Sequence, residues 1–316
     1  MPVHRAIAFA PATVANVGPG FDVFGFALEK PGDTVEAWRI EKKGVRLVEV
    51  TGDDGKLTRE TDKNVASAVA GRMLRGAAAK FGVAVSLHKG LPLGSGLGSS
   101  SASAVAAALA VNAILDRPYA QDELLEFARY GEKIACGAAH VDNVAPALYG
   151  GFTVIVRQEP PEVVRLQCPK SWRAVVAHPH FELSTRKARA VLPRTVPLSR
   201  VTANVAGAAA AVAAVMGGDL ASLGRAITRE AIVTRARAGL IPGFKEVGEA
   251  AMAAGAAGFS ISGAGPSIFA LTDGDRRATL VGAKMVAAWR RLGIAADLYV
   301  SRVGAPGARL LGDKRS

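Results

Sequence analysis

Three glycines and three consecutive serines occur together in residues 92–103, PLGSGLGSSSAS. Before them, residues 83–88 alternate apolar and other side chains as a strand does, and after them residues 104–115 are rich in alanine, leucine and valine, as in a buried helix. The glycines therefore lie at a strand-to-helix junction, where unpaired backbone N–H groups meet the positive end of a helix dipole. Because glycine also lets the backbone approach a ligand closely, this stretch predicts a phosphate-binding loop.

Two common phosphate motifs do not fit this loop. No lysine follows Gly98, as the P-loop of nucleoside triphosphatases requires, and the glycines are spaced Gly-x-Gly-x-Gly, not Gly-x-Gly-x-x-Gly as in the dinucleotide-binding motif. A tight turn into a core helix is the alternative interpretation. The coincidence of three glycines with three serines favours phosphate binding.

Glu132 lies on a helix predicted over residues 122–135, where it shares a face with Leu125 and Ala128. Burying an unpaired carboxylate is costly, so we expect a cation beside it. Magnesium takes few protein oxygens, and one serine hydroxyl at a helix start with one carboxylate would suffice. A surface glutamate or a structural ion pair is the alternative.

Composition limits the partners of the chain. Half of its 316 residues are hydrophobic, which indicates a globular protein with room for two medium domains. The net charge of +12 comes with no basic helix face interleaved with aromatic residues, so we expect no nucleic-acid partner. The start of the chain has too short an apolar run for a signal peptide. Residues 201–218 predict a helix packed inside the protein and not a membrane span, so we expect a cytoplasmic protein with no membrane partner.

Strands and helices are mixed without strict alternation, which predicts the α+β class. A proline pair in residues 159–162 marks a connection, so we expect domains at 1–160 and 161–316. We also expect loops at 11–22 and 137–151 and a frayed tail at 304–316. The expected strands are 6–10, 34–40, 45–50, 83–88, 152–156, 174–177, 258–262, 267–271 and 297–302, and the expected helices are 64–81, 104–115, 122–135, 184–191, 200–216, 220–234, 244–254 and 276–292.

Three stretches carry a resemblance to a known family. Residues 92–102 resemble the nucleotide loop of the GHMP kinase superfamily, which covers galactokinase, homoserine kinase, mevalonate kinase and phosphomevalonate kinase. Residues 11–22, PATVANVGPGFD, and residues 262–267, SGAGPS, are similar to two further motifs in their homoserine kinase form. Family-like blocks extend from Ala8 to about Arg302, so the chain is identified as a member of the homoserine kinase family.

The resemblance implies a fold and an activity. The fold is the two-domain GHMP kinase fold, with an N-terminal domain like ribosomal protein S5 domain 2 and a C-terminal ferredoxin-like domain. The activity is transfer of the ATP γ-phosphate to the side-chain hydroxyl of L-homoserine, giving O-phospho-L-homoserine in threonine biosynthesis, by a homodimer. Another GHMP kinase, such as a mevalonate kinase, is one alternative. A basic nucleic-acid-binding module is another, but it leaves the phosphate loop without a purpose.

The resemblance also implies the site residues. For ATP these are Pro92, Leu93, Gly94, Ser95, Gly96, Leu97, Gly98, Ser99, Ser100, Ser101 and Ala102, and for Mg²⁺ they are Ser100 and Glu132. For L-homoserine they are Asn16, Asp22, His140, Thr185, Arg189, Arg237 and Gly263. Catalytic roles fall on Asp142, Asn143 and Arg189, and the arginine fork suits the substrate carboxylate.

Three roles stay open. Asp142 is either a base for the substrate hydroxyl or part of a site that works by alignment and electrostatics, with Asn143 and His140 positioning substrate. We favour the second interpretation, and a loop-capping role for Asp142 is a third. Arg235 lies close enough to Arg237 to compete for the substrate. The turn at residues 263–265 stabilises the phosphate loop, lines the substrate carboxylate site, or is a plain hairpin.

Overall fold

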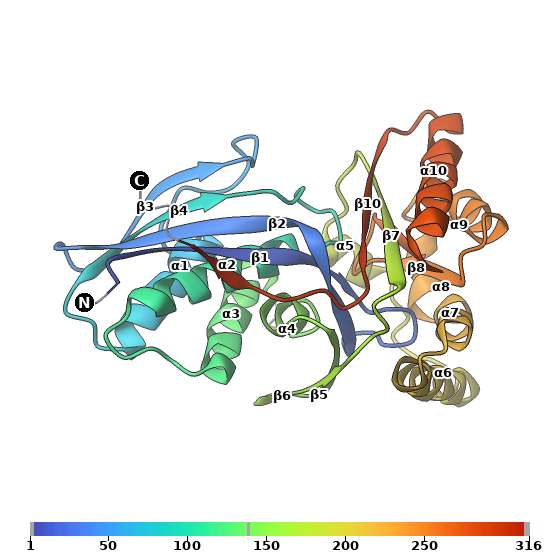
Figure 1. Ribbon diagram of the computed structural model, residues 1–316, viewed down its shortest axis with the longest axis horizontal. Coiled ribbons are helices and arrows are strands. Elements are labelled where there is room, and N and C mark those ends of the chain that lie inside the picture. The colour runs from blue at the N-terminus through green and yellow to red at the C-terminus, as the bar shows by residue number, and fades with distance from the viewer. Residues whose placement is uncertain (1–2, 138–139, 313–316) are drawn as a thin grey trace.

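A mixed sheet in the first half of the chain carries a layer of helices on one face (Figure 1). The computed structural model describes residues 3–137 and 140–312. The strand order is β11-β1-β2-β4-β3, with β5 pairing β2 and β6 pairing β5. The strands are β1 (Arg5–Ala15), β2 (Phe24–Ile40), β3 (Val45–Thr51), β4 (Gly82–His88), β5 (Phe152–Gln158), β6 (Pro161–Leu166) and β11 (Arg309–Leu311), and the helices are α1 (Val65–Gly76), α2 (Ser99–Ile114), α3 (Gln121–Cys136) and α4 (Val144–Tyr149).

The second half is built on a four-stranded antiparallel sheet of order β10-β7-β9-β8. Strands and helices follow one another there in the β-α-β-β-α-β sequence typical of a ferredoxin-like fold. The strands are β7 (Trp172–Pro179), β8 (Gly258–Ile261), β9 (Ile268–Asp273) and β10 (Ala296–Arg302), and the helices are α5 (Thr185–Ala190), α6 (Leu198–Gly217), α7 (Leu220–Thr228), α8 (Val233–Ala238), α9 (Phe244–Ala253) and α10 (Asp275–Arg291). Together the two sheets confirm the α+β class.

Helix α2 is the central element of the first half. It is apolar on all sides, and it packs against β1, β2, α1 and α3. Such a helix is stable only when it is buried, and its many alanines allow close approach to the sheet. Helix α2 begins at Ser99, five residues earlier than predicted, so all three serines belong to its first turn. The phosphate loop therefore precedes a helix that the core holds in place.

Several predicted boundaries were wrong because pairing with distant segments overrides local sequence preference. Strand β1 continues to Ala15 into the expected loop, and α4 lies inside the loop expected at 137–151. The helix expected over 220–234 is divided into α7 and α8, and β6 was not predicted. The expected frayed tail contains β11, which pairs with β1. The boundary at residue 160 stays a prediction; by sheet membership, β6 and β11 lie with the first sheet.

Among the described helices, α6 alone has the length and composition to cross a membrane, with a mean hydropathy of 1.4. Only 17% of this stretch is buried in the protein. The prediction of a helix at 200–216 is confirmed, but the prediction that it is packed inside the protein is wrong. Composition alone cannot tell an apolar helix in a core from one on a surface.

Candidate active site

A cavity of about 620 Å³ is lined by residues from both halves of the chain. Most of the predicted site residues line it: Asn16, Asp22, Leu93, Gly94, Ser95, Gly96, Gly98, Ser99, Ser100, Glu132, His140, Asp142, Asn143, Thr185, Arg189, Arg237 and Gly263. The four others, Pro92, Leu97, Ser101 and Ala102, do not line it, and the last three are fully buried. The structure thus brings together residues that are up to 247 positions apart in the chain.

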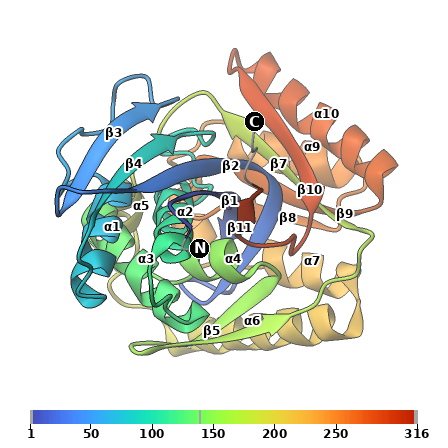
Figure 2. The ribbon, with the colours of Figure 1, turned by 60° about the vertical axis from the view of Figure 1, so that its left-hand side comes forward.

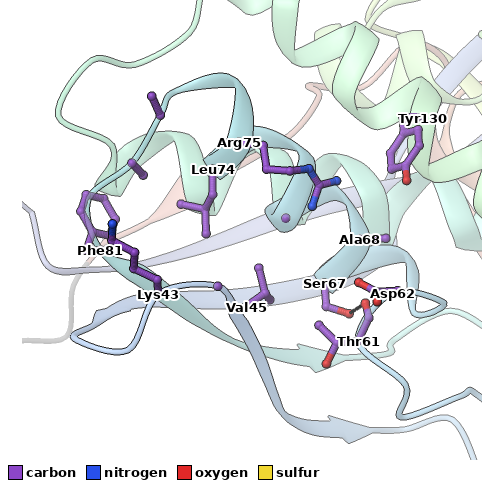
Figure 3. A pocket seen from close by; sticks show the side chains of 14 residues that line it. Lys43, Val45, Thr61, Asp62, Ser67, Ala68, Leu74, Arg75, Phe81 and Tyr130 are labelled. Carbon is purple, nitrogen blue, oxygen red and sulfur yellow. Dashed lines mark hydrogen bonds between the residues drawn. The ribbon is translucent and has the colours of Figure 1, made fainter.

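A second cavity of about 660 Å³ lies between α1 and β3, with Lys43, Arg75, Phe81 and Tyr130 around it (Figure 3). Buried polar atoms without a hydrogen-bond partner distinguish the two cavities. Six residues that line the first cavity carry such an atom: Ser95, Ser99, Glu132, His140, Asp142 and Arg189. Within residues 3–137 and 140–312, no residue with such an atom lines the second. Because buried polar groups are normally paired, the first cavity is the one shaped for a polar ligand.

In the phosphate loop, four consecutive backbone carbonyls are held by residues from three different segments of the chain. The Gly94 carbonyl accepts from the backbone N–H of Leu183 at 3.0 Å, and the Leu97 carbonyl accepts from that of Thr13 at 3.1 Å. The Ser267 hydroxyl donates to the Ser95 carbonyl at 2.6 Å, and the Ser262 hydroxyl donates to the Gly96 carbonyl at 2.8 Å. The turn that joins β8 and β9 therefore holds the phosphate loop, which favours the stabilising role among the alternatives for that turn.

The backbone N–H groups of the same loop have no such partners. In the part of the chain that the structure describes, no protein acceptor bonds to the N–H groups of residues 94–101. The side chain of Gly98, the N-cap residue of α2, is a hydrogen atom and cannot cap the helix. Free N–H groups at the positive end of a helix dipole attract anions, so the loop is shaped to bind phosphate.

Glycine is required at the centre of this loop for steric reasons. Gly96 has φ +78°, and a Cβ atom there would lie 2.4 Å from the Ser262 carbonyl oxygen. Gly98 has φ +68°, and a Cβ atom there would lie 2.2 Å from the Thr13 hydroxyl oxygen. The left-handed backbone and the close contacts exclude any side chain at both positions.

A buried ion pair anchors the start of α2. Lys89 pairs with Asp33, and its ammonium also donates to the Ser99 carbonyl and the Ser103 hydroxyl, each at 2.9 Å. Asp33 in turn accepts from the backbone N–H groups of Gly90 and Leu91. A paired and hydrogen-bonded buried charge is tolerated, whereas an unpaired one is costly. Sequence reasoning missed this anchor, because residues 56 positions apart give no local signal.

Glu132 projects from α3 toward the first turn of α2. Its side chain is buried, and one carboxylate oxygen, Oε1, has no hydrogen-bond partner. Burial raises the pKa of Glu132, and the Ser100 and Ser101 hydroxyls and the Lys89 ammonium partly offset this rise. An unpartnered carboxylate oxygen near a serine hydroxyl and the phosphate loop fits a divalent cation, as the sequence predicted.

A cluster of charged residues forms another part of the wall. The Arg189 guanidinium donates to both carboxylate oxygens of Asp22, at 2.6 and 3.2 Å, and both Arg189 and Arg237 lie 5.2 Å from the Phe21 ring. Arg237 is buried and donates to the Gly263 carbonyl at 2.9 Å. Burial, and then repulsion by Arg189, lower the pKa of Arg237 to about 10.

Asn16 fixes the backbone of the loop that carries Asp22. Its side-chain amide donates to the Gly263 carbonyl at 2.7 Å, and its side-chain oxygen accepts from the backbone N–H of Asp22 at 3.0 Å. Both residues have positive φ angles, 68° and 58°. Such conformations are uncommon outside glycine and often mark functional loops. Of the two competing arginines, Arg237 lines the cavity, whereas Arg235 is exposed and does not.

Asp142 and its neighbours complete the cavity. Burial, with repulsion by Asp22 and Glu132, raises the pKa of Asp142 to about 7. The Asn143 side-chain oxygen accepts from the Thr13 hydroxyl at 2.8 Å. Burial lowers the pKa of His140, although Asp22 lies 3.8 Å away and opposes this effect. These groups can hold or orient a hydroxyl beside the phosphate loop.

Comparison with known proteins places this geometry in a family. The family models for the GHMP kinases N terminal domain and GHMP kinases C terminal match residues 64–151 and 208–291. The homoserine kinases of Chlorobaculum tepidum and Chlorobium phaeovibrioides are 40% and 41% identical over 315 residues, covering 96% of this chain and 97% and 98% of theirs. The crystal structure of homoserine kinase from Cytophaga hutchinsonii matches with a TM-score of 0.95 at 44% identity, covering 98% of both chains.

The chain belongs to the homoserine kinase family of GHMP kinases. This confirms the resemblance of residues 11–22, 92–102 and 262–267 to the family motifs and the two-domain GHMP kinase fold that it implied.

Several residues that line the cavity were not predicted. They include Leu57, Thr58, Asn64, Val65, Leu87 and Lys89, which come from the segment before α1, from α1 and from around β4. Leu57, Val65 and Leu87 are apolar, and from a sequence alone such positions are interpreted as core residues. The cavity is therefore lined by apolar side chains, by the phosphate loop and by a charged cluster.

Gly96→Ala should abolish nucleotide binding while leaving the protein folded, because the added methyl group displaces the phosphate loop. Gly137→Ala is the matched control: Gly137 has φ +79°, but no atom of the described residues lies within 4 Å of its added Cβ. Calorimetric titration with ATP measures both variants. Equal ATP affinities in the two variants would contradict the steric argument.

Asp142→Asn should change how stability depends on pH. The folded protein holds a proton on Asp142 up to about pH 7, whereas the unfolded chain releases it near pH 4. Between these values the folded state binds more protons, so the free energy of unfolding falls as pH rises. Relative to Asp142→Asn, the wild type should lose up to ~4 kcal/mol between pH 4 and 8. Urea unfolding of both proteins, with Asp62→Asn as an exposed control, measures this, and parallel pH profiles would refute it.

Proposed function

We propose that the protein transfers the γ-phosphate of ATP to the side-chain hydroxyl of L-homoserine, giving O-phospho-L-homoserine on the route to threonine. One observation carries the proposal: residues 94–96 and 98–100, whose backbone N–H groups are free, and the Asp22–Arg189–Arg237 cluster line the same cavity. Phosphoryl transfer depends mainly on positioning and on electrostatic stabilisation, and both parts of the cavity supply them.

The charged cluster suits an amino acid better than other small alcohols. L-homoserine carries an ammonium, a carboxylate and a hydroxyl group. Asp22 and Arg189 form an ion pair. A zwitterionic substrate can replace this pair, with its ammonium bound to Asp22 and its carboxylate bound to Arg189. Arg237 adds a second cation for the carboxylate, and Thr185 and His140 line the same cavity.

An assay coupled to ADP release, with ATP and either L-homoserine or mevalonate, tests this proposal. We expect rapid turnover of L-homoserine and little of mevalonate, because mevalonate has no ammonium group to pair with Asp22. Rapid turnover of mevalonate without turnover of L-homoserine would favour the alternative GHMP kinase activity.

Ser100 and Glu132 would hold Mg²⁺, which when bound neutralises phosphate charge. The unpartnered Oε1 of Glu132 supports this assignment. No group of three His, Cys, Asp or Glu residues in the described chain could hold a metal, so the ion would rest on few protein oxygens.

Glu132→Gln should raise the Mg²⁺ concentration needed for half-maximal rate by at least about tenfold, because a charged ligand becomes neutral. Titration of the activity with MgCl₂ measures this. An unchanged Mg²⁺ requirement would show that Glu132 is not a ligand. Glu126→Gln, an exposed substitution on the same helix, is the control.

For Asp142 we favour alignment and electrostatics over proton abstraction. Asp142→Asn should then reduce turnover by less than about tenfold, since general-base catalysis typically contributes a hundredfold or more. Steady-state kinetics at pH 8, where the wild-type carboxylate is largely ionised, measure this. A loss of several hundredfold would identify Asp142 as the base.

We also propose that the chain acts as a homodimer in the cytoplasm, where ATP is available. The exposed apolar surface of α6 supports the dimer, because large exposed apolar patches usually form protein–protein contacts. Recovery of the activity with membranes after cell fractionation would overturn the location.

A further inference from the structure

Helix α6 exposes an apolar surface that the fold leaves uncovered. Leu198, Val205 and Met216 are 79%, 62% and 74% exposed, and only Ala211, Ala214 and Val215 are buried. Arg200, in the first turn of α6, is the one charged residue of the helix, and residues 201–218 contain none, although 21% of the chain is charged. A helix on a protein surface normally turns a polar face to water, so this face is built for a contact.

The opposite side of α6 supports the substrate loop. The Asn204 side-chain amide donates to the Pro19 carbonyl at 3.0 Å, and a Cβ atom at Gly207 would lie 3.4 Å from the Pro19 ring. Helix α7, which packs on α6, contacts the same loop, because a Cβ atom at Gly18 would lie 2.6 Å from Ile227 Cα. The loop that holds Asn16 and Asp22 in strained conformations therefore lies on the α6–α7 pair.

We propose that a second copy of this chain covers α6 and thereby braces the substrate loop. This inference rests on the proposed homodimer and on L-homoserine as substrate. In a two-fold contact the same surface meets itself, so any charged residue near the axis would face its own like charge. A charge-free face is what such a contact requires, above all in a chain with a net charge of +12.

The distribution of side-chain size along α6 also fits a second copy. The large exposed side chains, Leu198 and Met216, lie at opposite ends, and alanine and glycine predominate between them. An antiparallel pair places Leu198 beside the partner subunit's Met216, and the small residues between allow the two helices to approach closely.

A stable interface buries about 800 Å² on each partner. One face of a 20-residue helix, which is about 30 Å long, is too narrow to supply that area alone, so neighbouring elements must contribute. The β5–β6 hairpin, with exposed Val156 and Val164, lies along the same lower side of the molecule as α6 in both views (Figures 1 and 2). A membrane is a poorer occupant, because helices that bind membrane surfaces carry lysine and arginine beside bulky apolar residues. A spanning helix would also have to pull Ala211 and Val215 out of the core.

The test replaces Val201 and Val205 together by glutamate, which places four carboxylates in the contact, with the two at position 205 within one helical turn of the two-fold axis. Leu280→Glu on α10, also an exposed apolar position, is the control. By analytical ultracentrifugation we expect the wild type and the control at about twice the chain mass of 32.5 kDa, and V201E/V205E at the chain mass. We also expect V201E/V205E to raise KM for L-homoserine at least fivefold and to change KM for ATP less than twofold.

Several outcomes would overturn the inference. A monomeric wild type, or a dimer that persists in V201E/V205E, rejects α6 as the contact. A monomeric variant with an unchanged KM for L-homoserine rejects the bracing of the loop. If the wild type sediments with vesicles of phosphatidylcholine and phosphatidylglycerol and V201E/V205E does not, the surface binds a membrane instead. Sedimentation does not depend on the substrate, so its result stands even if L-homoserine is not turned over.

A second measurement avoids substitutions. Dilution of the wild type should raise KM for L-homoserine over the concentration range in which the dimer dissociates. Asn204→Ala, which removes the contact with Pro19 but lies away from the exposed face, should keep the dimer and also raise this KM. A KM that is constant through dissociation would contradict the bracing.

Discussion

The structure depends on how the backbone of residues 94–97 is held. Each of its four carbonyl groups accepts a hydrogen bond from a residue far away in the chain, and these residues are Leu183, Ser267, Ser262 and Thr13. A peptide group whose oxygen is fixed on one side directs its N–H group to the other. The N–H groups of the loop are therefore oriented before any ligand arrives, and little reorganisation is needed to bind phosphate.

This arrangement makes the contact between the two halves of the chain part of the site. Ser262 and Ser267 come from the turn between β8 and β9, whereas the phosphate loop leads into α2 of the first half. The same turn supplies the Gly263 carbonyl, which accepts from Asn16 and Arg237. One short turn thus positions both the nucleotide loop and the substrate loop, and a shift between the two halves would disturb both.

Local sequence patterns predicted the phosphate loop because its evidence is local: glycines, serines and a following apolar helix within 24 residues. The position of Glu132 on the apolar face of α3 could also be predicted, because helix periodicity is a local pattern. The substrate residues came only from family resemblance, since no spacing links Asp22 with Arg189. Lys89 and Asp33, the strand β11 and the exposure of α6 gave no signal, because each depends on contacts between segments that only the folded chain brings together.

The most direct test is a crystal structure with a non-hydrolysable ATP analogue, Mg²⁺ and L-homoserine. We predict phosphate oxygens within hydrogen-bond distance of the backbone N–H groups of residues 94–101, with the carbonyl contacts to Ser262 and Ser267 unchanged. A triphosphate bound elsewhere, with this loop empty, would contradict it.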